Sequence, residues 1–131
     1  MGADAFKAAV LAGDEDGLAE VLADDVVFRS PAVYKPYEGR EATMLVLRAV
    51  SWVFQDFRYE DRFEGEDGEV LLFSARVGDR ELNGIDLLRF DDAGRIRELT
   101  VMIRPLSGLT ALVEAMGREL ERMGVPVPGK A

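Results

Sequence analysis

Hydrophobic positions in the first half of the chain recur with helical spacing. A short helix is expected over Ala3–Leu11, and Asp14 is placed to cap a second one. A short β-branched strand, Val26–Ser30, then stops at a proline. The clearest helix is Arg40–Phe54, because its apolar side chains recur three and four residues apart, at Ala42, Leu45, Val46, Ala49, Val50 and Val53.

The second half of the chain alternates as strands do. Over Asp56–Glu64 the alternation places four side chains on one face: Phe57, Tyr59, Asp61 and Phe63. Val70–Val77 is apolar on both faces and predicts a central strand. Glu81–Phe90 and Ile96–Arg104 follow after turn residues. A last helix is expected to have Ser107 as its cap and to end at Gly124.

This order of elements predicts one α+β domain over residues 1–124 and an extended tail over residues 125–131. The antiparallel strands are expected to form a strongly bent sheet wrapped on the N-terminal helices, with the C-terminal helix beside it. Such a sheet makes a cone with an internal pocket. Since Val70–Val77 is also apolar on its outer face, we expect a homodimer formed through the sheet.

The composition excludes several kinds of chemistry. The chain of 131 residues has no cysteine and no histidine, so thiol nucleophiles, histidine-dependent triads and thiolate or imidazole metal sites cannot be built. We expect no metal and no cofactor. The net charge of −9 would repel nucleic acid and anionic membranes, and the apolar runs are too short to span a bilayer. The N-terminus lacks the pattern of a signal peptide, which favours a cytoplasmic protein.

The strongest candidate for chemistry is Asp86. Alternation along Glu81–Phe90 puts its side chain on the same face as Leu88 and Phe90. A carboxylate on an apolar face must be paired, hydrogen-bonded or protonated, because a stranded charge is costly. A carboxyl group of raised pKa serves as a general acid or hydrogen-bond donor. The alternative is a structural ion pair between Asp86 and an arginine.

Further residues are candidates for lining the pocket, although each also has an ordinary structural explanation. Polar candidates are a hydroxyl at a strand end, two loop tyrosines, a second carboxylate between aromatic positions and an arginine that could bind an acidic ligand or Asp86: Ser30, Tyr34, Tyr37, Asp61 and Arg104. Candidates for the apolar wall are Phe6, Trp52 and Leu88. Turn formation, packing or solvation would explain the same residues without a ligand.

Several runs of the chain carry a further signal. They are Ala12–Asp14 with Gly17 and Leu18, the run Leu22–Phe28, the Gly39 that opens a helix, and Ile85–Ile96. These runs resemble the NTF2-like superfamily, which includes the SnoaL-like polyketide cyclases and ketosteroid isomerase. The resemblance implies a cone-shaped, cystatin-like α+β fold with a pocket that Asp86 faces, and commonly a dimer made by the sheets.

The resemblance also shows what this chain lacks. Ketosteroid isomerase uses an Asp base, with a Tyr and a protonated Asp as oxyanion donors. The position of the base is Ser30 here, the position of the Tyr is Phe6, and only the second Asp is kept, as Asp86. Some cyclases rely on a histidine, and this chain has none. Epoxide hydrolase-like members carry an arginine where this chain has Gly84. These departures argue against ketosteroid isomerase chemistry.

Two functions remain open from the sequence. The first is proton-transfer chemistry of the isomerase, cyclase or dehydratase type on a small, apolar, carbonyl-containing molecule. Asp86 would be the acid, base or donor, and Ser30, Tyr34 and Tyr37 would orient the substrate. The second is a non-catalytic module of the same fold that binds a ligand or forms a dimer. The missing base and donor favour the second.

Overall fold

A computed structural model describes residues 2–125, so the predicted tail lies outside the described residues apart from Val125. In chain order the elements are α1 (Gly2–Ala12), α2 (Glu15–Val21), β1 (Leu22–Arg29), β2 (Tyr37–Glu38), α3 (Arg40–Val53), β3 (Gln55–Glu64), β4 (Gly68–Val77), β5 (Arg80–Phe90), β6 (Ile96–Arg104) and α4 (Leu106–Met123). None of these helices is long and apolar enough to cross a membrane.

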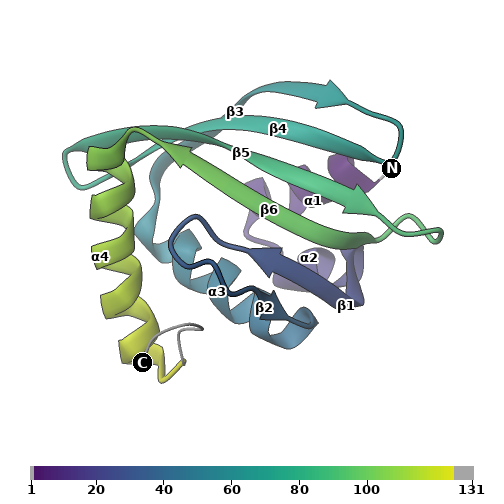
Figure 1. Ribbon diagram of the computed structural model, residues 1–131, viewed down its shortest axis with the longest axis horizontal. Helices are drawn as coiled ribbons and strands as arrows, with labels where there is room; N and C mark the ends of the chain where they lie inside the picture. The colour runs from purple at the N-terminus through teal and green to yellow at the C-terminus, as the bar shows by residue number, and fades with distance from the viewer. Residues whose placement is uncertain (1, 126–131) are drawn as a thin grey trace.

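The six strands form one curled sheet in the order β2-β1-β6-β5-β4-β3 (Figure 1). The predicted α+β arrangement of helices against a bent sheet, with a C-terminal helix, is confirmed. One detail differs, because β1 pairs with β6 in parallel and the other pairs are antiparallel. A parallel pair needs a long crossover, and everything from β2 to β5 lies between these two strands in the sequence.

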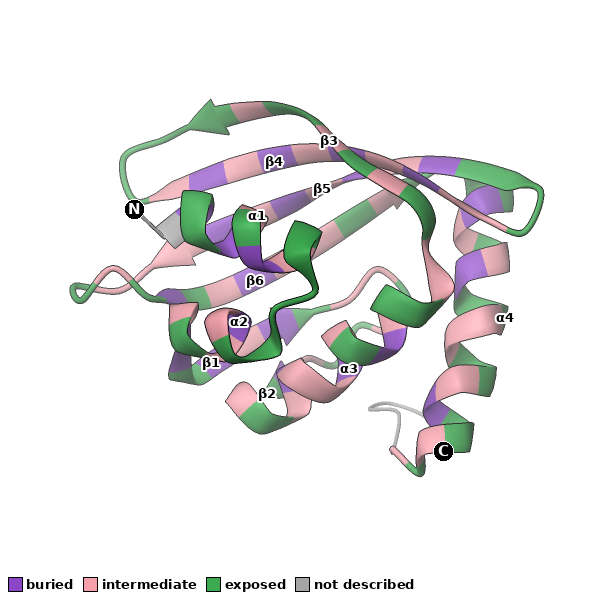
Figure 2. Cartoon of the chain, turned by 180° about the vertical axis from the view of Figure 1, so that it is seen from behind, coloured by how far each residue is buried: buried purple, intermediate pink, exposed green. Residues whose placement is uncertain are grey.

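The four helices lie on one side of the sheet (Figure 2). Burial along β4 and β5 alternates, with the buried positions facing the helices. The main core joins α1, β1 and the inner side of the sheet, and its fully buried side chains include Phe6, Leu22, Leu71, Leu88, Ile96 and Leu99. The concave side of the sheet is therefore where a cavity can form.

A β-bulge in β3 changes which side chains face the helices. Tyr59 lies opposite Phe73, but Asp61 lies opposite Leu72, so β3 carries one extra residue between them. An extra residue reverses the alternation beyond it. Asp61 and Phe63 are therefore exposed on the outer face, and the prediction that they share a face with Phe57 and Tyr59 is wrong.

Beyond the bulge, Arg62 takes the helix-facing position instead. Its guanidinium forms ion pairs with Asp4 of α1 and Glu64, and its Nε lies 3.1 Å from the buried Glu69 carboxylate of β4. A buried carboxylate needs such a partner, because stranding its charge is costly. This cluster attaches the N-terminal helix to the edge of the sheet.

The helix caps follow the sequence in one case and depart from it in another. Asp14 caps α2, since its side chain accepts a hydrogen bond from the Gly17 backbone N–H at 3.0 Å. Ser107 does not cap α4. Pro105 occupies that position and has no side-chain hydrogen bond, and the helix begins at Leu106. The predicted cap of α2 is confirmed. The cap of α4 lies two residues before the predicted one.

Gly84, on the inner face of β5, is a position where a side chain would not fit. An added Cβ would lie 2.3 Å from the Met102 carbonyl oxygen and 2.9 Å from Cζ of Phe73. Because backbone and a packed ring cannot both move away, we expect Gly84→Ala to lower the free energy of unfolding by about 2–3 kcal/mol, measured by urea denaturation.

Gly117 supplies the matched control for this substitution. It lies exposed within α4, and an added Cβ would meet no atom of residues 2–125 within 4 Å. Gly117→Ala should therefore raise stability by about 0.5–1 kcal/mol, through helix propensity alone. Equal effects at the two glycines would contradict the close packing described at Gly84.

Candidate functional site

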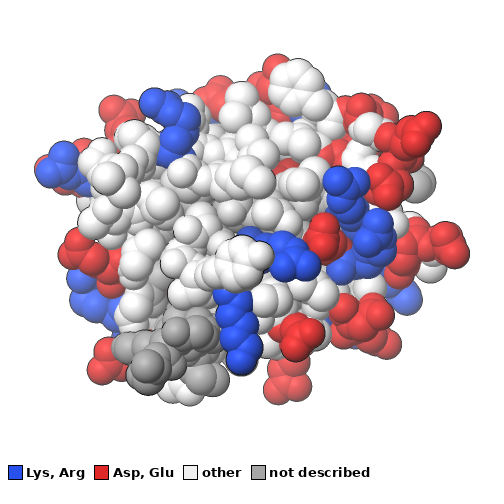
Figure 3. Space-filling view, viewed as in Figure 1, with Lys and Arg blue, Asp and Glu red and all other residues white. Residues whose placement is uncertain are grey.

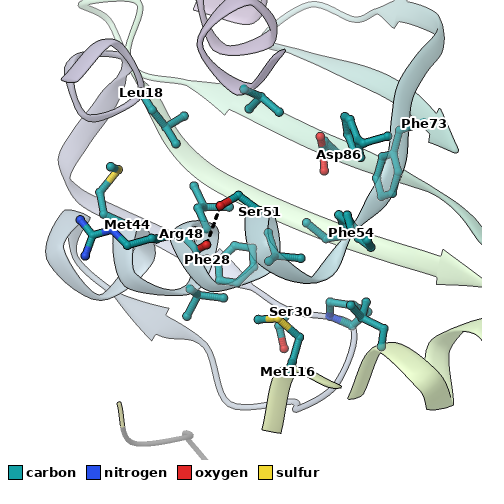
Figure 4. Close-up of a pocket in the computed structure, with 18 of the residues that line it drawn as sticks. Leu18, Phe28, Ser30, Met44, Arg48, Ser51, Phe54, Phe73, Asp86 and Met116 are labelled. Atoms are coloured by element: carbon teal, nitrogen blue, oxygen red, sulfur yellow. Dashed lines mark hydrogen bonds between the residues drawn. The ribbon is translucent and has the colours of Figure 1, made fainter. Parts of the chain in front are cut away.

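A cavity of about 490 Å³ lies between the concave side of the sheet and the helices (Figure 4). Its walls come from all four helices, from β1 with the loop after it, and from the inner faces of β3 to β6. The volume lies within the usual range for sites that bind small molecules. The bend of the sheet thus leaves room for a ligand.

The wall is mostly apolar and partly aromatic. Phe57 stacks on Phe54 and on Phe73, with ring centroids 5.6 Å and 5.2 Å apart. Tyr59 meets the edge of Phe57 at 5.0 Å. Val101 and Met116 add aliphatic surface to the same wall. Such a wall favours a ligand with a flat or compact apolar body.

Asp86 brings a carboxyl group into this apolar wall. It lies on β5 between Leu71 of β4 and Val101 of β6, and its residue is 8% exposed. Burial raises the pKa of Asp86 from 3.8 to about 7, and the neighbouring Tyr59 hydroxyl offsets a part of that rise. Within residues 2–125, no cation contributes to this pKa. The alternative of an ion pair with an arginine is therefore absent from the described residues.

Tyr59 is the polar neighbour of Asp86 in the cavity. Burial raises the pKa of the Tyr59 hydroxyl, and the Asp86 charge raises it further. The hydroxyl oxygen is buried and has no hydrogen bond of normal geometry within the described part of the chain. Its nearest polar group is the Asp86 carboxyl, and a ligand oxygen that enters the cavity can accept the hydroxyl proton in its place.

Together these two side chains can move a proton. A carboxyl group of pKa near 7 is present in both its acid and its base form at neutral pH. A buried phenol that stays protonated can donate a hydrogen bond to a carbonyl oxygen. The sequence alone does not identify Tyr59 as a site residue. No local pattern shows that only β4 separates β3 from β5 in the sheet, which is what brings Tyr59 close to Asp86.

Four predicted site residues meet at the cavity: Phe6, Ser30, Tyr37 and Asp86. The Ser30 Oγ accepts hydrogen bonds from the backbone N–H groups of Ala32 and Val33, both at 3.2 Å, so it also shapes the turn after β1. Tyr37 is buried with its ring 5.8 Å from that of Phe28, and burial raises its pKa.

The other predicted residues lie outside the cavity. Tyr34 is 99% exposed, because its loop turns outward before β2, and Trp52 is 72% exposed, because it lies off the apolar stripe of α3. Asp61 is on the outer face beyond the bulge. Leu88 is buried in the core, where side chains surround it. Arg104 is exposed on the outer face, with Nη1 3.2 Å from the Asn83 side-chain oxygen.

The cavity also has a polar margin that the sequence did not indicate, made of Asp14, Glu15, Arg48 and Ser51. Arg48 of α3 pairs with Glu15 of α2, and its Nη2 lies 2.6 Å from Oε1 of that carboxylate. The Ser51 hydroxyl donates to the Arg48 carbonyl at 2.6 Å (Figure 4). Among residues 2–125, no three acidic side chains gather as a metal site would need.

Known proteins show the same fold. A steroid delta-isomerase from Pseudomonas aeruginosa is 45% identical, with a TM-score of 0.89 over 93% of this chain and 90% of that one. An uncharacterized protein with a cystatin-like fold from Silicibacter pomeroyi DSS-3 is 32% identical, with a TM-score of 0.87 over 92% of this chain and 85% of that one.

A more distant structure shows the fold alone. An NTF2-like protein of unknown function from Mesorhizobium loti is 22% identical, with a TM-score of 0.69 over 79% of this chain and 88% of that one. No match was found among curated proteins. The predicted cystatin-like, NTF2-like fold is confirmed.

The family follows from the sequence match. The model of the SnoaL-like domain matches residues 3–99, which span α1 to the start of β6 and include Asp86. That match covers well over half of the chain, and it agrees with the runs that carried the resemblance. The chain therefore belongs to the SnoaL-like family.

Proposed function

We propose that this protein binds a small, largely apolar, carbonyl-containing molecule in the cavity and transfers a proton through Asp86. The observation that carries the proposal is the buried Asp86 carboxyl, with a pKa of about 7, beside the buried Tyr59 hydroxyl in an apolar cavity. The similarity to a protein named as a steroid delta-isomerase supports an isomerase-type reaction.

The proposed roles fit a one-base isomerisation of a β,γ-unsaturated ketone. The ionised Asp86 takes a proton from the carbon between the carbonyl and the double bond, and Tyr59 donates a hydrogen bond to the oxygen of the resulting enolate. The protonated Asp86 then returns the proton to the γ-carbon, which leaves a conjugated enone. Asp86 on β5 would thus act as the base, a role that Ser30 cannot fill. Tyr59 on β3 would act as the hydrogen-bond donor, a role that Phe6 cannot fill.

The test offers two ketones of different size, androst-5-ene-3,17-dione and cyclohex-3-en-1-one, and follows formation of the conjugated enone. We expect enone formation above the rate in buffer for the ketone whose body fits the cavity. If neither ketone is converted while an apolar fluorescent probe still binds, the catalytic proposal is wrong.

Probe binding without conversion of either ketone would support the non-catalytic candidate, a binding module of the same family. Two observations favour it: the Ser30 hydroxyl is already bonded to its own turn, and the Phe6 side chain has no polar atom. Under this candidate Asp86 and Tyr59 only hydrogen-bond a ligand carbonyl, which requires the protonated carboxyl.

We further propose that two copies pair through the outer face of the sheet. Phe63 and Met102 are 57% and 54% exposed there, and Val70, Leu72, Ile85 and Leu87 share that face. Figure 3 shows a broad uncharged area over β4–β6, with charged side chains at its edges. An exposed apolar patch with a polar rim is typical of a protein interface.

Analytical ultracentrifugation at micromolar concentration tests this pairing. We expect the mass of two chains for the wild type and of one chain for Leu87→Asp, because a buried unpaired charge at the interface is costly. Tyr34→Asp, in the exposed loop between β1 and β2 and outside the strands that form the patch, should keep the dimer. A wild type that sediments as a single chain would refute the pairing.

A further inference from the structure

We propose that the ligand of this cavity carries an anionic group, such as a carboxylate, at the end opposite its carbonyl, and that Arg48 binds this group. The inference rests on the proposed function, since it assumes that the cavity holds a ligand whose carbonyl meets Asp86. It adds the chemical class of the ligand: an amphipathic molecule with an apolar body, a carbonyl and an acid.

The first support is the position of the charged residues around the cavity. Apart from Asp86, the charged lining residues all belong to the polar margin, where α2 and the loop before it meet α3. Arg48 is the one cation that lines the cavity among residues 2–125. In Figure 4 its guanidinium lies well apart from Asp86 and Phe73. A ligand that spans the cavity would therefore meet the two groups at different ends.

The second support is the way Glu15 holds the guanidinium. Both Nε and Nη2 of Arg48 donate to the same oxygen, Oε1, at 3.0 Å and 2.6 Å. Within residues 2–125, Nη1 makes no hydrogen bond. Guanidinium groups usually bind a carboxylate through two parallel bonds to two oxygens. Arg48 thus keeps donors that an incoming anion can use.

The third support is the exposure of this ion pair. The side chain of Arg48 is 41% exposed and that of Glu15 is 56% exposed. An exposed ion pair contributes little to folding, so a ligand can displace or share it at small cost. Arg48 is also a lining residue of the largely apolar cavity, so an anion bound to it would lie at the cavity margin. Glu15 would then hold the Arg48 guanidinium in position. It would also weaken binding of the anion, because its carboxylate competes with the anion for the same guanidinium.

Two fluorescent probes with the same ring system separate the charge from the apolar body. They are 8-anilinonaphthalene-1-sulfonate, which carries an anionic group, and N-phenyl-1-naphthylamine, which does not. We expect Arg48→Leu to weaken binding of the sulfonate about tenfold and to change binding of the neutral probe less than twofold, because one charge-assisted hydrogen-bonded contact is lost. Arg48→Lys should keep part of the sulfonate affinity, and Glu15→Gln should increase it.

The control variant is Arg122→Leu. Arg122 is an exposed arginine of α4 that also pairs with a glutamate, Glu119, but it does not line the cavity. It should leave the binding of both probes unchanged. Thermal melting of each variant checks that the fold is kept, since both arginines are exposed.

The outcomes distinguish this inference from the function on which it rests. Unchanged sulfonate binding in Arg48→Leu, or equal weakening of both probes, overturns the anion site while the cavity remains a binding site. If the wild type binds neither probe, the proposed ligand-binding function fails, and the anion site with it. The inference is supported if Arg48→Leu weakens binding of the sulfonate alone and Glu15→Gln strengthens it.

Discussion

Asp86→Asn is expected to make the protein more stable at pH 8, by up to about 4 kcal/mol, and to change little near pH 4. The reason is that burial raises the pKa of Asp86 from 3.8 to about 7, so the folded state prefers the protonated form. A carboxyl of this kind contributes its full stability below pH 4 and loses it as the pH rises through 7. The pKa difference corresponds to about 4 kcal/mol, and the neutral asparagine avoids this loss.

Urea denaturation at pH 5 and pH 8 measures this effect. Asp92→Asn is the control, because Asp92 lies exposed in the turn before β6 and should give the same small difference at both pH values. If Asp86→Asn were less stable than the wild type at pH 8, the carboxylate would be ionised and satisfied in the folded protein. The proposed acid and base roles would then lose their basis.

Asp86→Asn is also expected to lower enone formation by about 10²–10⁴-fold, since asparagine can neither take nor return a proton. Tyr59→Phe should lower it by about 10²–10³-fold, because it removes the hydrogen bond to the enolate oxygen and leaves the apolar ring in place. In the wild type the rate should rise as the pH passes through about 7, where the pKa of Asp86 lies and the base becomes ionised. Initial rates over pH 5–9 measure all three.

The exposed Tyr34 gives the matched control for Tyr59, as Tyr34→Phe removes the same atom from a side chain that does not line the cavity. It should keep the wild-type rate and pH profile. A pH profile without a change near 7, or activity that survives in Asp86→Asn, would assign the proton transfer to another group. Binding of the neutral naphthylamine probe separates a lost reaction from a lost ligand.

Much of the fold could be predicted from local periodicity. The spacing of Val46, Ala49 and their neighbours marked α3, and the alternation along Glu81–Phe90 placed Asp86 inward. These features depend on neighbours within one element, which the sequence records directly. The expected bend of the sheet predicted an internal pocket, and the family resemblance implied the same pocket with Asp86 facing it.

The errors arose where distant parts of the chain decide the outcome. The bulge that turns Asp61 outward depends on pairing with β4, and the parallel β1–β6 pair depends on the whole crossover. Tyr59 and Asp86 approach each other only through the order of β3, β4 and β5. The sequence alone does not indicate Arg48, because its partner at the cavity margin is Glu15, which lies 33 positions earlier in the chain.

The bulge in β3 has a consequence for how this strand can change in evolution or in design. Upstream of it, Phe57 and Tyr59 shape the cavity, and downstream Arg62 fastens α1 to the sheet. The extra residue separates the two alternating patterns, so a substitution at Phe57 can alter the cavity wall without reversing the inward position of Arg62. Tyr59 links the two parts, because the Lys7 amine of α1 lies 5.7 Å from the centroid of its ring, so a new ligand preference in this strand would arise most simply at Phe57.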